Sequence, residues 1–310
     1  MSDNKISRRT LLKALLALGI SGPGLSSLLY AATQNTITKN IPSSGEKIPV
    51  IGLGTSRTFD ALDDEELLLH LKKVMHIFFD KNGMLVDSSP MYGSAQAVIG
   101  KLIKNISNDQ NLFSATKVWT DGEKAGIEQM EKSRQLWGVK RFDLMQIHNL
   151  RDWEVHYETL TKMKAEGKIR YIGVTTSHGR FHQELEVLLD TLKFDFVQLS
   201  YNINNRDVEQ RLLPIAADKG IAVIVNRPYQ RGDLFRNIKG KALPKWSSEI
   251  DVTSWGQFFL KFIVSHPAVT CAIPATTKVK HLLDNMTAQT GRLPDAKMRN
   301  EMIRYFRAQA

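Results

Sequence analysis

Short apolar runs and longer segments of helical periodicity alternate along most of this chain. Each run is typical of a buried strand, and between the runs apolar residues recur every three or four positions. The predicted strands span residues 84–86, 111–116, 142–147, 194–200, 221–225 and 269–273. The predicted helices span residues 65–79, 95–104, 123–137, 153–166, 206–219, 254–265 and 295–306. This alternation indicates an α/β fold in which helical crossovers join parallel strands.

Polar residues follow three of these strands at once. Asp87, Lys117 and His148 come directly after the first three predicted strands, and Tyr92 follows in the turn Asp87-Ser-Ser-Pro-Met-Tyr-Gly93. The carboxyl ends of parallel strands meet at one rim, where barrels of this kind carry their chemistry. We therefore expect four groups that can hold or move protons to converge there.

Together the four residue types suit the reduction of a carbonyl group. Tyr92 is the natural proton donor, because hydride addition leaves an alkoxide that needs a proton. The Lys117 ammonium is expected to lower the tyrosine pKa, and Asp87 to hold the lysine. His148 can donate a hydrogen bond to the carbonyl oxygen. Taken singly, each residue also has an ordinary structural explanation, such as a helix cap, a rim aromatic or a solvated lysine.

The constellation resembles the catalytic tetrad of the aldo-keto reductases, with Asp87, Tyr92, Lys117 and His148 in the four places. Further segments from residue 39 onward are similar to that family's opening hairpin and first strand, third strand, fifth strand and eighth strand with its phosphate loop. These segments span residues 45–55, 117–119, 167–174 and 273–278. The resemblance implies one (β/α)8 TIM barrel with an N-terminal β-hairpin. It also implies an NADP(H)-dependent oxidoreductase that reduces aldehydes or ketones, with Tyr92 as general acid.

The resemblance also implies where the cofactor binds. The nicotinamide would lie across the barrel mouth and the phosphates beyond it, and a helix start with hydroxyls and a lysine favours NADP(H), with NAD(H) possible. The matching residues are Gly54, Thr55, Asp87, Thr175, Thr176, Gln198, Asn226, Arg227, Thr276, Thr277, Lys278, Asp284 and Asn285.

The chain departs from the family at three of these positions. Thr176 stands where an amide is usual, and Asn226 where an aromatic ring often stacks on the nicotinamide. Arg227 replaces a small serine, and it either binds the pyrophosphate or caps a strand against a carboxylate. Gly52-Leu-Gly54 is not a dinucleotide fingerprint, because Arg57 takes the place of the third glycine and no helix opens there.

The sequence identifies the substrate pocket less clearly than the cofactor site. Met91, Trp119 and Tyr229 are its candidate residues, with Trp153 on a neighbouring loop. A mostly apolar pocket would accept small carbonyl or alcohol substrates with little discrimination. The alternative function is a cofactor-binding sensor or scaffold on the same barrel with little turnover.

The first residues resemble a twin-arginine (Tat) export signal. Ser7-Arg8-Arg9 opens a mildly apolar run that Gly19, Gly22 and Pro23 interrupt, so we expect no stable membrane span. The expected organisation is a signal peptide over residues 1–32 and a barrel domain over 33–310. The Tat translocase would then be a partner during export and the periplasm the location. Uncleaved anchoring remains an alternative.

Composition narrows the remaining possibilities. The 310 residues carry a net charge of +10, and removing residues 1–32, with four basic residues and one acidic residue, leaves +7. Such a charge attracts anions in general, but we expect no nucleic-acid partner because no DNA- or RNA-binding module is present. The only cysteine, Cys271, excludes an internal disulfide. No histidine or cysteine spacing predicts a metal site, and we expect a monomer.

Overall fold

A computed structural model of the chain describes residues 35–104, 106 and 111–309. Met1–Asn35 and Thr36–Ala310 are separate units, and every described strand and helix belongs to the second. The predicted signal peptide over residues 1–32 lies outside the described residues. No helix in the described part of the chain is long and apolar enough to cross a membrane.

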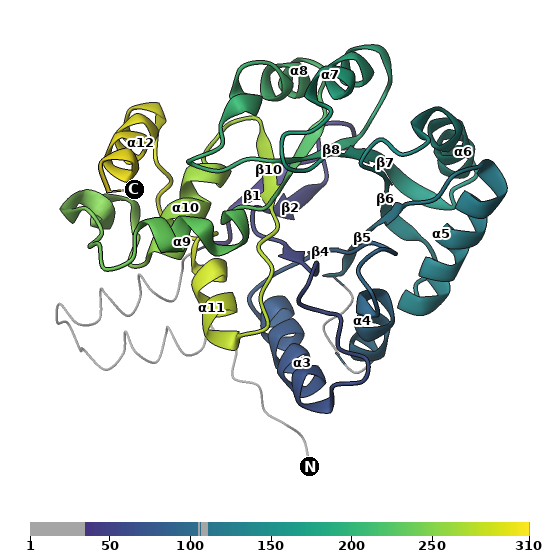
Figure 1. Cartoon of the computed structure of the whole chain (residues 1–310), viewed down its shortest axis with the longest axis horizontal. Coiled ribbons are helices and arrows are strands. Elements are labelled where there is room, and N and C mark those ends of the chain that lie inside the picture. Colours follow the sequence, from purple (N-terminus) through teal and green to yellow (C-terminus); the bar gives the residue numbers. More distant parts are fainter. Residues whose placement is uncertain (1–34, 105, 107–110, 310) are drawn as a thin grey trace, which may run out of the picture. The chain divides into compact units, whose positions relative to one another are not determined.

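Eight parallel strands form one sheet that closes on itself (Figure 1). They are β3 (Leu53–Gly54), β4 (Leu85–Asp87), β5 (Phe113–Val118), β6 (Phe142–His148), β7 (Ile169–Thr175), β8 (Phe196–Ser200), β9 (Ala222–Asn226) and β10 (Val269–Ala272). Neighbours in the sheet follow chain order from β3 to β10. Parallel bridges from Ile51 to Ala272 and from Gly54 to Ala275 join the last strand to the first. The predicted (β/α)8 barrel is therefore confirmed.

A short antiparallel hairpin precedes the barrel. Its strands are β1 (Thr38–Asn40) and β2 (Lys47–Pro49), so the hairpin begins before the segment 45–55 that carried the family resemblance. Ile41 and Ile48 of the hairpin are fully buried in the apolar cluster that fills the barrel interior. The hairpin therefore contributes side chains to the interior core.

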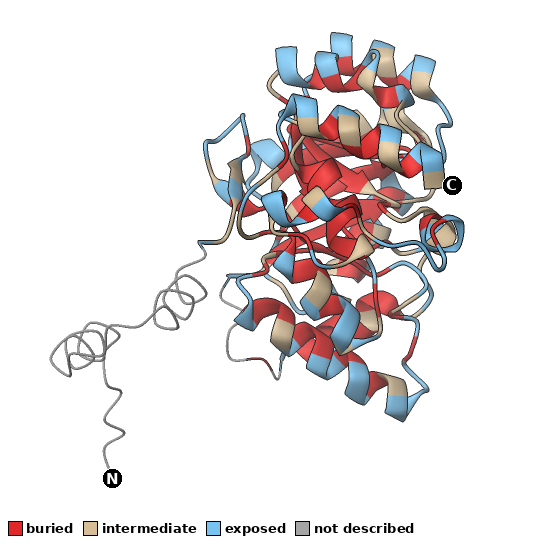
Figure 2. Ribbon diagram, turned by 90° about the vertical axis from the view of Figure 1, so that its left-hand side faces the viewer, coloured by how far each residue is buried: buried red, intermediate tan, exposed pale blue. Residues whose placement is uncertain are grey.

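Helices surround the strands, most of them with one buried face. They are α3 (Glu65–Asp80), α4 (Ala95–Ile103), α5 (Glu123–Trp137), α6 (Trp153–Ala165), α7 (His182–Thr191), α8 (Leu212–Asp218), α9 (Asp233–Asn237), α10 (Trp255–Val264), α11 (Val279–Thr287) and α12 (Ala296–Gln309). Helix α10, in contrast, is buried from Gly256 to Val264. Three short 3-10 helices accompany them: η2 (Asp207–Glu209), η3 (Gln230–Gly232) and η4 (Lys245–Ile250). Figure 2 shows the buried residues on the strands and on the inward helix faces.

Three local predictions differ from the structure. The helix predicted over 206–219 is divided, because Pro214 cannot follow a continuous helix and is tolerated only in the first turn of α8. The last strand ends at Ala272 rather than entering the 273–278 segment, where Pro274 cannot donate to a ladder. Helix α7 was not predicted; its buried face consists of Leu185, Leu188 and Leu189.

Helices α4 and α5 approach each other closely at Gly100. A Cβ atom on this glycine would lie 1.8 Å from the carbonyl oxygen of Leu136 and 3.1 Å from the Cα atom of Trp137. The neighbour is backbone rather than a flexible side chain, so the helices must separate to accept any other residue. Gly100 is thus a packing requirement of the barrel wall.

Gly100→Ala should lower the free energy of unfolding by about 3 kcal/mol, at the upper end of overpacking costs. In an exposed helix the same substitution raises the free energy of unfolding by about 1 kcal/mol. The sign of the measured change therefore tests whether Gly100 is in close contact with α5. Denaturant unfolding measures it, with Lys132→Ala on the exposed face of α5 as the control, expected within about 0.5 kcal/mol of the wild type. A stabilised Gly100→Ala protein would contradict the packing.

Candidate active site

The four residues of the expected tetrad come from adjacent parts of the barrel rim. Asp87 is the last residue of β4, Lys117 lies next to the end of β5, and His148 ends β6. Tyr92 stands in the turn that follows β4, where its backbone N–H donates to the carbonyl of Ser89 at 3.1 Å. The parallel register carries all four to the carboxyl ends of the strands.

A buried ion pair forms the base of this site. The ammonium of Lys117 lies 2.6 Å from a carboxylate oxygen of Asp87 and also donates to the carbonyl of Ser88 at 2.7 Å. The side chains of Lys117 and Asp87 are 0% and 3% exposed. Burial lowers the pKa of Lys117, but the attraction of the Asp87 carboxylate is the largest opposing influence, and this pKa lies above its ordinary value. The lysine therefore stays charged.

Two glutamines complete the surroundings of Asp87. The side-chain amides of Gln146 and Gln198 each donate to its second carboxylate oxygen at 2.9 Å, and Gln198 also donates to Gln146 at 3.2 Å. Both amides are buried. Because each carboxylate oxygen has donors, the cost of burying the charge is largely offset.

Tyr92 lies against the charged lysine. The Lys117 ammonium is 5.2 Å from the centre of its ring, and the ring of His148 meets it edge to face at 6.0 Å. Burial raises the tyrosine pKa, and the lysine charge and a hydrogen bond from Ser56 lower it only in part. The net shift is upward, so the expectation of a lowered pKa was wrong because desolvation exceeds the lysine's attraction. The phenol is protonated at neutral pH.

His148 is neutral over the whole physiological range. Burial and the nearby Lys117 charge lower its pKa to about 3. Its ring nitrogen Nδ1 is 3.0 Å from the hydroxyl of Ser89, and the indole of Trp119 lies 6.4 Å from its ring. A neutral imidazole in this position has one N–H to donate and one lone pair to accept.

The residues expected at the nicotinamide surround Gln198. Asn226 donates to the Thr176 carbonyl at 3.0 Å and to Gln198 at 3.4 Å, and it accepts from the hydroxyl of Ser200 at 2.6 Å. Thr176 itself leaves its hydroxyl buried without a hydrogen-bond partner. Asn226 thus braces the rim, while the orphaned hydroxyl of Thr176 is available to a ligand.

Three other expected cofactor residues shape the rim. Gly54 allows a close approach, since a Cβ atom there would lie 2.7 Å from the carbonyl oxygen of Ile273. Thr55 donates its hydroxyl to the Asp87 carbonyl at 2.9 Å, and the Thr175 hydroxyl accepts from the backbone N–H of Asn149 at 3.3 Å. These residues hold adjacent strands together at the mouth.

A cluster of cations faces the same mouth. Arg227 contacts the ring of His178, and its pKa is lowered by burial and by the charges of Arg231 and Arg57. Burial and the charges of Arg227, Arg231 and Arg180 likewise lower the pKa of His178. None of these arginines forms an ion pair with a carboxylate in the part of the chain that the structure describes. The alternative in which Arg227 caps a strand against a carboxylate is therefore not supported.

The residues expected at the adenosine end lie around the start of α11. Thr276 accepts from the backbone N–H of Lys278, the exposed residue that precedes the helix, at 3.0 Å, and Thr277 lies between them, half-buried. Asp284 accepts from Ser254 at 2.7 Å. Asn285 accepts from the hydroxyl of Tyr229 at 2.6 Å, so this candidate pocket residue contacts a residue expected at the adenosine end.

The remaining substrate candidates flank the tetrad or its neighbouring loop. Met91 is 42% exposed beside Tyr92 in the chain. Trp119 stands next to His148, and the guanidinium of Arg151 lies 5.0 Å from its ring. Trp153 begins α6 and packs against the main apolar cluster, which favours a structural part for it.

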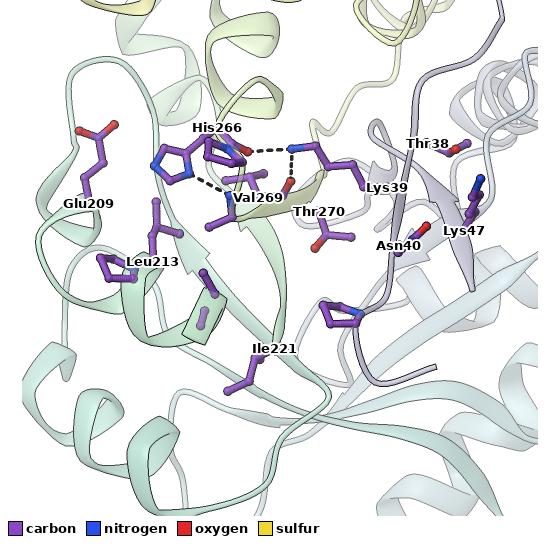
Figure 3. A pocket seen from close by; sticks show the side chains of 16 residues that line it. Thr38, Lys39, Asn40, Lys47, Glu209, Leu213, Ile221, His266, Val269 and Thr270 are labelled. Carbon is purple, nitrogen blue, oxygen red and sulfur yellow. Dashed lines mark hydrogen bonds between the residues drawn. The ribbon is translucent and has the colours of Figure 1, made fainter. Parts of the chain in front are cut away.

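A separate pocket of about 760 Å³ opens at the opposite end of the barrel (Figure 3). Its lining includes Ile221 and Val269, which lie at the amino ends of β9 and β10. Lys39 of the hairpin donates there to the carbonyls of His266 and Val269 at 2.7 and 2.5 Å. The tetrad stands at the carboxyl ends of the strands, so this pocket is not part of the site.

Sequence reasoning missed four residues that contact the tetrad. Ser56, Ser89 and Gln146 do so through their side chains, and Ser88 through its backbone carbonyl, which accepts from Lys117. Gln146 carried a signal, because it is a polar residue inside the otherwise apolar end of a predicted strand. Ser89 lay within the quoted turn without an assigned role. Nothing in the sequence indicated that the hydroxyl of Ser56 reaches Tyr92.

Comparisons with known proteins agree with this geometry. The aldo-keto reductase str7 of Strobilurus tenacellus is 22% identical over 248 residues, covering 68% of this chain and 74% of that protein. The uncharacterized oxidoreductase C215.11c of Schizosaccharomyces pombe is 30% identical over 203 residues, covering 64% and 61%. An aldo/keto reductase structure from Klebsiella pneumoniae in complex with NADP and acetate has a TM-score of 0.73 at 21% identity, covering 88% of this chain and 96% of that one.

The family assignment rests on the breadth of the match. A model of the aldo/keto reductase family matches residues 50–301, which extend from the first barrel strand into the last helix. The tetrad and the expected cofactor residues fall within this range. The chain therefore belongs to the aldo/keto reductase family.

Proposed function

We propose that this protein is an NADP(H)-dependent oxidoreductase that reduces aldehydes or ketones to alcohols, with Tyr92 as the general acid. The observation that carries the proposal is the protonated Tyr92 placed between a charged Lys117 and a neutral His148. Family membership supports the reaction class. The sensor or scaffold alternative has no need of this arrangement.

The residues at the mouth fit a dinucleotide. The buried hydroxyl of Thr176 has no partner, and the guanidiniums of Arg57, Arg227 and Arg231 meet without a carboxylate among the described residues. Orphaned donors and unpaired cations suit an amide and a diphosphate. Lys278, at the start of α11, suits a 2′-phosphate. Thr176 and Gln198 would hold the nicotinamide end, and when bound the cofactor supplies the hydride.

The chain's own residues would handle the proton. His148 would donate a hydrogen bond to the carbonyl oxygen and direct it toward the hydroxyl of Tyr92. Tyr92 would transfer its proton to that oxygen as negative charge develops there. The charge of Lys117 would then stabilise the phenolate, while Asp87 keeps the lysine in position. The elevated tyrosine pKa favours the protonated acid that reduction requires.

We also propose that the protein is exported folded, by the twin-arginine route, to the periplasm. Residues 1–32 lie outside the described residues, so the support is the sequence Ser7-Arg8-Arg9 and the weakly apolar run after it. A closed barrel is a suitable load for a pathway that carries folded proteins. A nucleotide bound before export would stabilise it further, by about 2.7 kcal/mol at one hundred times Kd.

Tyr92→Phe should reduce kcat for a reactive aldehyde by about 10² to 10⁴, because only the proton donor is lost. NADPH titration should give an unchanged Kd. The matched control is Tyr157→Phe, which removes a hydroxyl bonded to the Lys193 carbonyl away from the mouth. Activity within about threefold of the wild type in the Tyr92 variant would show that another group is the acid.

NADP(H) should bind more tightly than NAD(H), because Lys278 precedes a helix whose N-terminus attracts anions. Lys278→Ala should reduce the difference in binding free energy between NADP(H) and NAD(H) by about 1 to 2 kcal/mol, the scale of one charged hydrogen bond. Calorimetry with both nucleotides measures it, and Lys280→Ala, an exposed lysine of the same helix, serves as control. Equal wild-type affinities would refute the preference.

Export should depend on the arginine pair. Changing Arg8 and Arg9 together to Lys should retain the protein in the cytoplasm, whereas the conservative change Lys5→Arg should not. Cell fractionation followed by immunodetection gives the distribution. Unchanged export of the double variant would reject the signal assignment, and periplasmic protein entirely without nucleotide would reject loading before export.

A further inference from the structure

The hydroxyl of Ser89 contacts the ring nitrogen Nδ1 of His148. The Oγ to Nδ1 distance is 3.0 Å, and Ser89 and His148 are 0% and 6% exposed. Either atom could in principle donate the hydrogen, since serine and neutral histidine each have a donor and an acceptor. Which one donates determines the tautomer of the imidazole.

The surrounding bonds decide the direction. The backbone N–H of Met91 already donates to Ser89 Oγ at 3.4 Å. If Nδ1–H also donated, the hydroxyl hydrogen of Ser89 would have no acceptor among the described residues, at the cost of a buried unsatisfied donor. If Ser89 donates to Nδ1, every hydrogen in the group has an acceptor. The second arrangement is therefore favoured.

Donation by Ser89 leaves the other ring nitrogen of a neutral His148 with the hydrogen. In the described part of the chain Nε2 has no hydrogen-bond partner, so its N–H is free to reach a carbonyl oxygen. The imidazole ring meets the ring of Tyr92 edge to face at 6.0 Å, so the histidine lies beside the proposed proton source. The opposite tautomer would present a lone pair to the substrate oxygen and repel it.

We propose that Ser89 is a positioning residue that fixes His148 as the Nε2–H tautomer and thereby makes it a hydrogen-bond donor to the substrate carbonyl. The inference deepens the proposed carbonyl reduction and rests on it. Ser89 does not itself touch the reacting atoms; it acts only through His148.

The local sequence holds Ser89 in place. Pro90 restricts the residue before it to extended conformations, and the Ser89 carbonyl accepts the backbone N–H of Tyr92 at 3.1 Å. The short segment from the end of β4 through this turn therefore carries Asp87, Ser89 and Tyr92 together.

The tautomer is tested directly in the wild-type protein. Nitrogen-15 NMR at pH 7 distinguishes a protonated from an unprotonated ring nitrogen, and the His148 signals are assigned by their loss in His148→Asn. We expect Nδ1 unprotonated and Nε2 protonated in the wild type, and a mixture of tautomers in Ser89→Ala. A protonated Nδ1 in the wild type would overturn the proposal. This measurement does not depend on turnover, so it separates failure of the proposal from failure of the proposed function.

Kinetics supply the second arm. Ser89→Ala should lower kcat for a reactive aldehyde about tenfold, the effect of one hydrogen bond, with the Kd for NADPH unchanged. Ser89→Thr keeps the hydroxyl and should restore most of the rate. The matched control is Ser133→Ala, a buried serine that also accepts one bond, from Gln96, and donates one, to the Gln129 carbonyl, both at 3.0 Å.

The control separates positioning from stability. Both alanine variants should lose similar unfolding free energy, but Ser133→Ala should keep the wild-type kcat. A Ser89→Ala enzyme with the wild-type kcat and the wild-type tautomer would overturn the proposal. If Ser89→Ala does not fold, the wild-type NMR result alone decides.

Discussion

The ion pair between Asp87 and Lys117 is the interaction on which the rest of the site depends. Two opposite charges without solvent exposure are tolerated only when their remaining donors and acceptors are satisfied, and removal of one partner typically costs about 3 to 5 kcal/mol. Here Ser88, Gln146 and Gln198 supply those bonds from β4, β6 and β8 or their ends. The electrostatics of the site therefore depend on strand register. If one strand shifted along its neighbour, the charge of Asp87 or Lys117 would be buried without its partners.

The sequence predicted what depends on local pattern and missed what depends on distant contacts. Strand ends and helix periodicity placed Asp87, Lys117 and His148 on one rim, because each position follows from its own segment. The bonds from Gln146 and Gln198 to Asp87 join residues 59 and 111 positions apart, which no local pattern encodes. The prediction that the pKa of Tyr92 is lowered was also wrong. Desolvation raises this pKa, and desolvation depends on the assembled pocket rather than on residues nearby in the sequence.

The arginines fall into two groups, those paired with carboxylates and those that lie near one another at the barrel mouth. Arg134, Arg151 and Arg170 lie in ion pairs with carboxylates. Those that meet at the mouth repel one another instead and also stand in left-handed conformations, with φ of 65° at Arg57 and 52° at Arg227. Such residues cost free energy in the protein alone, about 1 to 3 kcal/mol for each strained backbone. A bound polyanion would relieve the repulsion. Nucleotide binding would therefore also stabilise the folded protein at the mouth.

The protonation states at the rim suit the proposed reduction of a carbonyl group. Lys117 stays charged, His148 stays neutral and Tyr92 keeps its proton, each because of burial or a buried partner rather than because of solvent pH. A site prepared in this way presents two N–H or O–H donors to a carbonyl oxygen and no base to an alcohol. Oxidation would first require the loss of the tyrosine proton against the desolvation of its phenolate. The protonated phenol and the charged lysine are therefore the states that the proposed reduction requires, because Tyr92 can donate its proton and Lys117 can stabilise the phenolate that forms.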